Sequence, residues 1–282
     1  MSDSELPLAG LRFTLVGPGR VGSSLAGWAT AAGAQLIEQS GRAGVERISS
    51  AGQELLLIAV PDPAVAEMAA GLARRPQAAV ALHTSGSLDA QALAPLRAAG
   101  SAVGSLHPLK AFPRALADPA EARGVFFALD GDEAARLLAQ RLAGAWGAVA
   151  AEVPAAARPL YHFAASLAAG GVVTLLAAAA EIAARLRLPP AVARGYLELA
   201  RGAVAAAIAA GEAARALTGP VARGEAATVR RQLAALREIA PEKLPLAVEL
   251  ARETLRHAAP QPAQEALASE LDRLRQELRD EN

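Results

Sequence analysis

The sequence predicts two domains in series: an α/β domain with a mostly parallel, doubly wound sheet, and an all-α domain after it. Three observations lead to this prediction. Short apolar runs alternate with helical stretches in the first half, as parallel strands joined by crossover helices do. A glycine-rich turn follows the first apolar run, and the strand pattern ceases after Pro154. This shift places the domain boundary at about residue 153 of 282, giving domains over 8–153 and 154–282.

The first half alternates strand and helix patterns in a regular order. Residues 55–60 give the clearest strand, because a continuous apolar run that stops at Pro61 is typical of a buried central strand. Strands are predicted over 11–16, 35–39, 55–60, 78–82, 102–106, 125–129 and 148–153, and helices over 20–32, 87–98 and 131–144, with another ending near 74.

The second half consists of alanine-rich helical segments, which prolines divide near 189, 220, 241 and 260. Residues 163–180 carry no charge, which raises the question of a membrane span. The run is mostly alanine and glycine and occurs once, so we expect a helix buried inside the helical domain. Leucines at 267, 271, 274 and 278 give the last helix an apolar seam, which is expected to pack on the domain or on a partner.

Composition narrows the function classes. The formal net charge is zero, so no basic field indicates nucleic acid or anionic lipid as a partner. Cysteine is absent, which excludes disulfides, thiolate zinc sites and cysteine nucleophiles. The acidic first residues lack the basic region of a secretory signal, and we expect a cytoplasmic protein.

The turn after the first strand reads Gly17-Pro-Gly-Arg-Val-Gly22 and lies where a strand gives way to a helix. Glycine at three positions serves a tight turn, close approach of the backbone to a pyrophosphate, and packing of helix on strand. The helix N-terminus adds free N–H groups and the positive end of its dipole. We therefore favour dinucleotide binding over a purely structural turn, with contacts from Gly17, Pro18, Gly19, Arg20, Val21 and Gly22.

The end of the second strand bears on the choice between NAD and NADP. An acidic residue there favours NAD, whereas arginine accommodates a 2′-phosphate. Glu38 lies inside the predicted strand, while Ser40 and Arg42 lie at its tip. Arginine can pair with phosphate in bidentate geometry. NADP is therefore favoured over NAD, with a solvated surface arginine as the alternative interpretation of Arg42.

Two of the four histidines, His83 and His107, close predicted strands at the edge where open α/β sheets bind ligands. A third, His162, follows Tyr161 at the start of the uncharged helix. Histidine titrates near neutral pH and can pass a proton, so for each one a functional role competes evenly with capping or packing. The spacing of histidines and carboxylates does not indicate a metal site.

Six short segments together carry a resemblance: 17–22, 59–62, 83–86, 105–110, 161–162 and 216–224. They resemble a bacterial family of two-domain proteins with a Rossmann-like domain, a helical domain of unknown function and an unassigned substrate. That family is distantly similar to pyrroline-5-carboxylate reductase, prephenate dehydrogenase and 6-phosphogluconate dehydrogenase. The resemblance implies NADP binding and a helical domain that completes the active site, often in a dimer. It also implies cofactor contacts from Val60, Pro61, Asp62 and Thr84.

One position departs from the family pattern. Such proteins usually carry a Ser-Asn pair one to two turns after Tyr-His, where this chain has Ala169 and Gly170. An amide there would touch substrate or nicotinamide. The departure therefore bears on the chemistry and leaves the cofactor inference untouched.

The sequence thus predicts an NADP-dependent oxidoreductase acting on a carbonyl or imine of a small carboxylate-bearing metabolite. His107 or His162 is expected as the acid, with Tyr161 beside them. The remaining substrate contacts are expected from Lys110 and Arg223 as anion anchors and Thr218 as a positioning hydroxyl. These groups are expected to face one cavity, in a homodimer formed through the helical domain. The alternative, favoured by Ala169 and Gly170, is a non-catalytic NADP-binding sensor or partner-docking module.

Overall fold

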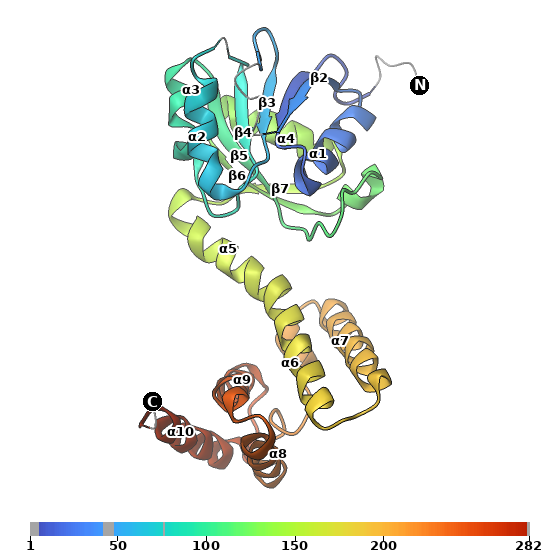
Figure 1. Cartoon of the computed structure of the whole chain (residues 1–282), viewed down its shortest axis with the longest axis vertical. Helices are drawn as coiled ribbons and strands as arrows, with labels where there is room; N and C mark the ends of the chain where they lie inside the picture. The colour runs from blue at the N-terminus through green and yellow to red at the C-terminus, as the bar shows by residue number, and fades with distance from the viewer. Residues whose placement is uncertain (1–5, 42–47, 76, 281–282) are drawn as a thin grey trace. The chain divides into compact units, whose positions relative to one another are not determined.

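The computed structural model describes residues 6–41, 48–75 and 77–280 (Figure 1). Residue contacts divide the chain into two compact units, Met1–Ala169 and Gly170–Asn282. Within the described part of the first unit, seven strands form one sheet in the order β2-β1-β3-β4-β5-β6-β7. The strands are β1 (Arg12–Val16), β2 (Gln35–Ser40), β3 (Leu55–Ile58), β4 (Val80–His83), β5 (Ala102–Pro108), β6 (Phe126–Gly131) and β7 (Val149–Glu152).

The sheet is mostly parallel, as the sequence predicts. Neighbouring strands run parallel except β5 and β6, which pair antiparallel. Every residue of the central strands β3 and β4 is buried, which explains why both are continuously apolar up to His83. The carboxyl ends of β1, β3, β4 and β5 therefore meet at one edge, where ligands of open α/β sheets bind.

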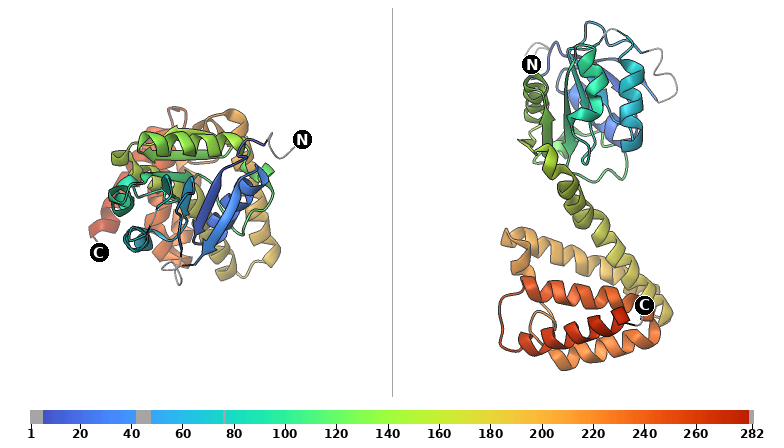
Figure 2. Two further views of the ribbon diagram at one scale, coloured as in Figure 1. Left: turned by 90° about the horizontal axis from the view of Figure 1, so that it is seen from above. Right: turned by 90° about the vertical axis from the view of Figure 1, so that its left-hand side faces the viewer.

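Helices cover both faces of the sheet (Figures 1 and 2). On one face, α1 (Arg20–Ala31) and α4 (Glu133–Ala145) pack on the larger hydrophobic core, in which the indoles of Trp28 and Trp146 lie 5.9 Å apart. On the other face, α2 (Asp62–Leu72), η3 (Ala90–Leu93) and α3 (Ala94–Ala98) pack on a second core. Two packed faces are what a doubly wound sheet requires.

The helix predicted over 87–98 begins only at Ala90, so its first turn is wrong. The preceding segment is held as a loop by local hydrogen bonds. The Ser85 hydroxyl accepts the N–H groups of Ser87 and Leu88, and the Asp89 carboxylate accepts the Gln91 N–H at 2.9 Å. Serine and aspartate compete in this way with helical hydrogen bonds.

The second unit is helical throughout its regular structure, as predicted. Its elements are α6 (Val172–Arg185), α7 (Pro190–Ala210), η7 (Ala213–Ala216), α8 (Ala226–Ile239), η8 (Pro241–Lys243), α9 (Leu244–His257) and α10 (Gln264–Asp280). A small core joins α8, α9 and α10. Leu267 and Leu271 are buried in it, and Leu274 and Leu278 pack against it. The apolar seam of the last helix therefore packs on its own unit.

The expectation of a buried uncharged helix is wrong. A helical run covers Ala155–Arg185, made of η5 (Ala155–Ala157), α5 (Arg158–Ser166), the π-helical turn η6 (Leu167–Gly171) and α6. Its most apolar window has a mean hydropathy of 1.9, and none of that window is buried. By length and composition it is the one helix among the described residues that could cross a membrane. Ala183 is the only buried residue of α6, because the small alanine side chains of this helix leave its larger apolar groups without a covering layer.

Candidate functional site

The glycine turn joins β1 to α1, and its three glycines have different surroundings. Gly17 has a φ of +90°, and a Cβ built there would lie 2.4 Å from the carbonyl oxygen of Ala59. A Cβ at Gly22 would lie 2.2 Å from the carbonyl oxygen of Gly17. At Gly19 the backbone is extended, and no described atom lies within 4 Å of a built Cβ. Packing therefore requires glycine at the first and third positions and leaves the second open for a ligand.

The N-terminus of α1 follows this open position. No side chain caps the helix within the described residues, and Gly19 is its N-cap. The Ser23 hydroxyl donates to the carbonyl oxygen of Pro18 at 3.1 Å, which fixes the turn from behind. Unpaired N–H groups and the positive dipole end of the helix thus face the turn, an arrangement that binds anions such as a pyrophosphate.

Ser40 lies beside the turn, because its carbonyl oxygen accepts the Gly17 N–H at 2.8 Å. Glu38 lies two residues before the end of β2, and its carboxylate accepts the Ser49 N–H at 3.5 Å. Glu38 therefore lies inside the strand, as the sequence predicts. Arg42, on which the NADP preference depends, lies outside the described residues.

The neighbouring strand ends carry the other expected cofactor contacts. Val60 is buried and Pro61 is exposed where β3 gives way to α2. The Asp62 carboxylate accepts the Ser87 hydroxyl at 2.5 Å, and the Thr84 N–H donates to the Ile58 carbonyl oxygen at 3.1 Å. These four residues lie on the same edge as the glycine turn, and their contact with a cofactor stays a prediction.

A cluster of aromatic groups lies at the ends of β4 and β5. The Tyr161 hydroxyl is 2.9 Å from Nδ1 of His107. The rings of His107 and His162 have centroids 5.6 Å apart and meet edge to face. A Cβ built at Gly86 would lie 2.5 Å from Nδ1 of His162 and 2.7 Å from Nε2 of His107. The structure thus brings these three expected residues together, and only glycine fits opposite the two imidazoles.

His107 and Tyr161 are both uncharged at neutral pH. Burial lowers the pKa of His107 to about 4, and the nearby His162 and Arg158 add to the effect. Burial also raises the pKa of the Tyr161 hydroxyl, against the opposing influence of Arg158. When the hydroxyl donates to Nδ1, the imidazole hydrogen resides on Nε2, the atom that faces Gly86. His107 therefore offers a neutral N–H, not an imidazolium.

His162 presents an unsatisfied polar atom. Its Nδ1 is buried and has no hydrogen-bond partner within the described part of the chain. Buried polar nitrogen atoms are nearly always paired, with a protein group, water or a ligand. This nitrogen is therefore a candidate partner for water or a ligand group, while the buried Gly86 beside it leaves no room even for a Cβ.

His83 has a structural role that its position at a strand end does not reveal. It is fully buried, its Nδ1 accepts the Ser85 N–H at 3.2 Å, and its Nε2 donates to the Asp89 carbonyl oxygen at 3.0 Å. Burial lowers its pKa to about 4. Its neutral ring therefore shapes the loop that carries Gly86.

Sequence reasoning missed Arg158, Ser105 and Asp130. Arg158 is fully buried, contacts the Ser105 hydroxyl, and lies 3.7 Å from the Asp130 carboxylate. One signal was available: Arg158 is the only Asp, Glu, Lys or Arg between Glu152 and Glu181. A single charge in such an apolar run needs a buried partner or an exposed position.

The remaining expected site residues are Lys110, close to His107 in sequence, and Thr218 and Arg223, far from it. Lys110 is half-buried just past β5, and its N–H donates to Pro108. Thr218 and Arg223 belong to the second unit, where Arg223 pairs with Glu225 at 2.7 Å. Their convergence on the cluster stays a prediction.

Ala169 and Gly170 lie in the π-helical turn η6. The described residues contain no group of histidine and carboxylate side chains that could hold a metal ion.

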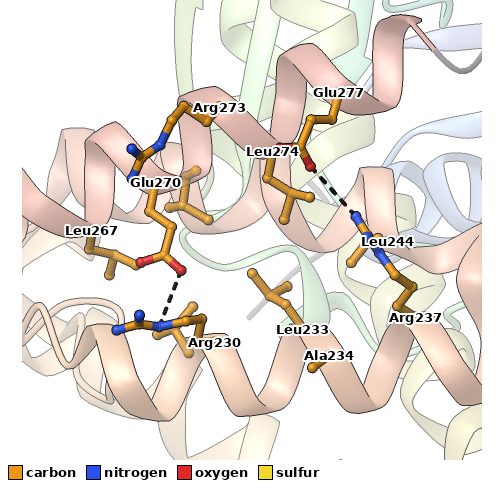
Figure 3. A pocket seen from close by; sticks show the side chains of 12 residues that line it. Arg230, Leu233, Ala234, Arg237, Leu244, Leu267, Glu270, Arg273, Leu274 and Glu277 are labelled. Carbon is orange, nitrogen blue, oxygen red and sulfur yellow. Dashed lines mark ion pairs between the residues drawn. The ribbon is translucent and has the colours of Figure 1, made fainter.

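The second unit contains a cavity of about 290 Å³ lined by α8, α9 and α10 (Figure 3). Leucines from all three helices line it, including Leu233, Leu244 and Leu267. Two ion pairs join α8 to α10 beside it, Arg230–Glu270 at 3.3 Å and Arg237–Glu277 at 3.9 Å. Both carboxylates of its lining pair with arginines, and the lining includes no histidine or tyrosine, unlike the His107 cluster.

Comparison with known families assigns both parts of the chain. Residues 32–108 match a Rossmann-like domain, and residues 125–254 match a domain of unknown function, DUF2520. No curated protein matches the sequence.

Solved structures share the fold. A protein from Bacteroides fragilis, named as a candidate NADP oxidoreductase, is 18% identical over 89% of this chain and 99% of its own, with a TM-score of 0.72. A protein from Thermotoga maritima is 22% identical over 87% and 98%, with a TM-score of 0.68. Pyrroline carboxylate reductase from Plasmodium falciparum, determined with NADP bound, is 13% identical over 89% and 99%, with a TM-score of 0.56.

At these identities the likeness of the solved structures extends to the fold alone. The first match runs from the end of α1 to the end of β5, and the second runs from the start of β6, through the last part of the sheet, to within α9. The chain therefore joins a Rossmann-like domain to a helical domain of the DUF2520 type.

Proposed function

We propose that this chain is an oxidoreductase that binds a nicotinamide dinucleotide across the Gly17–Gly22 turn. The observation that carries the proposal is the contrast among the three glycines. Packing accounts for Gly17 and Gly22, whereas open space surrounds Gly19. A glycine without a packing reason, at the N-terminus of an uncapped helix, is accounted for by a pyrophosphate lying against the backbone.

NADP is the proposed form of the cofactor. Ser40 and Arg42 follow the strand that meets the adenosine ribose, and Arg42 would pair with a 2′-phosphate. Glu38, the acidic residue that would favour NAD, is set back in β2 and contacts Ser49.

The His107 cluster is the proposed place for proton movement. A bound nicotinamide supplies or accepts hydride, so the protein must orient the substrate and handle one proton. When the Tyr161 hydroxyl donates to Nδ1, His107 would hold that proton on Nε2, beside Gly86. After its transfer to the substrate, the hydroxyl proton would move to Nδ1, and solvent would reprotonate the resulting tyrosinate. His162 directs an unpaired nitrogen to the same place. The cluster would thus polarise a carbonyl or imine with neutral donors.

The proposed substrate is a small metabolite that carries a carboxylate. Lys110 follows β5 directly and supplies the positive charge of the first unit nearest His107 in sequence. Thr218 and Arg223 of the second unit are proposed to complete anion binding. Arg223 already pairs with Glu225, so a substrate carboxylate would compete for its guanidinium.

The test is oxidation of NADPH by a panel of 2-oxo acids and cyclic imines. We expect at least one compound to oxidise NADPH in the presence of the wild type. His107→Gln should lose that activity, because His107 belongs to the proposed proton-transfer cluster. The variant should still bind NADPH, because the glycine turn is unchanged. Binding of NADPH without turnover of any compound would replace the enzyme proposal by the sensor, which Ala169 and Gly170 favour.

We also propose that the chain is a cytoplasmic homodimer, formed through its uncharged helix. Leu160, Phe163 and Leu167 are 75%, 59% and 57% exposed. A second copy of the same alanine-rich face could cover them by close helix packing. A membrane is the weaker occupant, because Arg158 of the same helix is buried in polar contacts of the sheet unit.

Light scattering after gel filtration tests this assembly. The wild type should have the mass of two chains, and Phe163→Glu the mass of one. Leu137→Glu is the matched control, because Leu137 is 59% exposed on α4. A single-chain wild type, or one that requires detergent, would contradict the proposal.

A further inference from the structure

Arg158 occupies an unusual position for an arginine. It is the first residue of α5, and its side chain is fully buried. One guanidinium nitrogen donates to the carbonyl oxygens of Leu88 at 3.0 Å and Ser85 at 3.3 Å. The other terminal nitrogen donates to the Ser105 hydroxyl, and Nε lies 3.7 Å from the Asp130 carboxylate. The guanidinium thus joins α5 to the loop after β4, to β5 and to β6.

Burying a guanidinium is unfavourable unless its charge and its N–H groups are satisfied. Here the two terminal nitrogens of the planar fork reach acceptors in several directions at once, which a lysine ammonium on a flexible stem does not reproduce. Nε has no hydrogen-bond partner among the described residues and only the charge of Asp130 near it. The Asp130 carboxylate is itself held, because it accepts the Ala90 N–H at 2.9 Å. The attachment is therefore fixed at both ends.

The attachment lies one helical turn from the candidate site. Tyr161 and His162 follow Arg158 by three and four residues, so all three lie on one face of α5. Ser85 and Ser105, which Arg158 contacts, are close in sequence to Gly86 and His107. The same guanidinium therefore holds both halves of the cluster.

We propose that Arg158 is the positioning residue that sets Tyr161 and His162 against His107. The proposal concerns the cluster invoked in the proposed function, and it rests on that function for its relevance to catalysis. The geometry of the cluster stands without it. A charge so close also acts on the imidazoles: Arg158 is among the groups that lower the pKa of His107, together with burial and His162, while Asp62 opposes them.

The titration of the four histidines tests the proposal without any cofactor. Their ring proton resonances can be followed by NMR from pH 8 to pH 5 and assigned with single His→Gln variants. In the wild type the His107 resonance should not move over this range, since its pKa is about 4. In Arg158→Met it should titrate with a pKa at least one unit higher, because the charge is lost and the cluster opens to water. Arg158→Lys should lie between the two.

Arg97→Met is the matched control. Arg97 forms a bidentate pair with Asp132 in the same unit, near the start of β5. Its loss should leave the His107 titration unchanged. Equal titration of His107 in the wild type and in Arg158→Met would overturn the proposal, and so would equal shifts in Arg158→Met and Arg97→Met.

Two further measurements keep the test decisive. If Arg158→Met does not fold, Ser105→Ala removes one partner of the guanidinium and should shift the His107 pKa in the same direction by a smaller amount. NADPH affinity should change by less than twofold in either variant, because the glycine turn is untouched. An unchanged His107 titration in the folded Ser105→Ala variant would also contradict the proposal. Failure of the wild type to bind NADPH would instead contradict the proposed function.

Discussion

The hydroxyl of Tyr161 lies 2.9 Å from Nδ1 of His107, although 54 residues separate the two in sequence. The contact joins α5 to the carboxyl end of β5, and the two rings meet edge to face at 5.6 Å. Both groups are uncharged at neutral pH, because burial lowers the pKa of the histidine and raises that of the tyrosine. The pair is therefore uncharged at rest, and a proton that it gives up has to be replaced from solvent.

Removing the hydroxyl tests the role of this pair. Tyr161→Phe keeps the ring and loses one hydrogen bond, so its free energy of unfolding should fall by only about 1 kcal/mol. If the pair transfers a proton, turnover should fall by about a hundredfold or more. Tyr196→Phe, which changes the other tyrosine of the chain, should affect neither quantity. Undiminished turnover by Tyr161→Phe would remove the hydroxyl from the mechanism.

The stability of the protein should depend on pH through His83. Its pKa is about 4 when folded and near 6.5 when unfolded, so the unfolded state binds the proton first as pH falls. Stability is therefore retained above about pH 6.5 and lost between pH 6.5 and 4, by up to about 3 kcal/mol for this residue. Urea unfolding at several pH values measures the effect.

His83→Gln should remove the His83 share of this pH dependence and leave the share of His107, whose pKa is also about 4, at some loss of stability at pH 7 from altered hydrogen bonds to Ser85 and Asp89. His257→Gln is the control, because His257 is 66% exposed in the second unit. If the two variants show the same slope as the wild type, the buried neutral histidine is not the cause.

Alanine substitutions at Gly17 and Gly19 of the turn should differ in their effect on the free energy of unfolding. The free energy of unfolding of Gly17→Ala should be at least about 2 kcal/mol lower than that of the wild type, because φ is +90° and the new methyl group would meet the Ala59 carbonyl. Gly19→Ala should lose no more than about 1 kcal/mol, because its extended backbone accepts alanine and only the preference of the helix N-cap for glycine over alanine opposes the change. Equal destabilisation by both changes would show that packing, and not a ligand, accounts for Gly19.

Arg42 should set the preference between cofactors. Loss of a charge-assisted contact to the 2′-phosphate is worth about 1.5–3 kcal/mol, or roughly ten- to a hundredfold in affinity. Arg42→Ala should therefore weaken NADPH binding by that factor and leave NADH binding unchanged. Calorimetry with both cofactors measures this, and equal affinity of the wild type for NADPH and NADH would refute the preference.

Much of the sheet could be predicted because glycine and proline mark its turns. The run that ends at Gly17 and the run that ends before Pro61 are β1 and β3. The helix expected over 87–98 begins at Ala90, because Ser85 and Asp89 accept local hydrogen bonds that hold the preceding residues as a loop. Composition does not reveal these hydrogen bonds. Boundaries set by side-chain capping are therefore the part of the fold that periodicity misses.

The site could be predicted only in part. Histidines at strand ends indicated where ligands bind, and His107, Tyr161 and His162 do lie together. Arg158 was missed because its partners are more than 25 residues away in the chain, on the loop after β4, on β5 and on β6. The uncharged helix was expected to be buried because a high hydropathy indicates a segment that is unfavourable in water. Hydropathy does not indicate whether the protein itself, a partner or a membrane covers that segment.

Calorimetric titration of NADPH into the wild type and into Gly19→Val tests the central claim most directly. A branched side chain at this position would occupy the approach of the pyrophosphate, and its Cβ would have no described atom within 4 Å beyond its chain neighbours and its own helix. We predict one NADPH bound per wild-type chain, and binding at least a hundredfold weaker in a Gly19→Val variant that unfolds at the wild-type temperature. Undiminished NADPH binding by that folded variant, or no binding by the wild type, would contradict the claim.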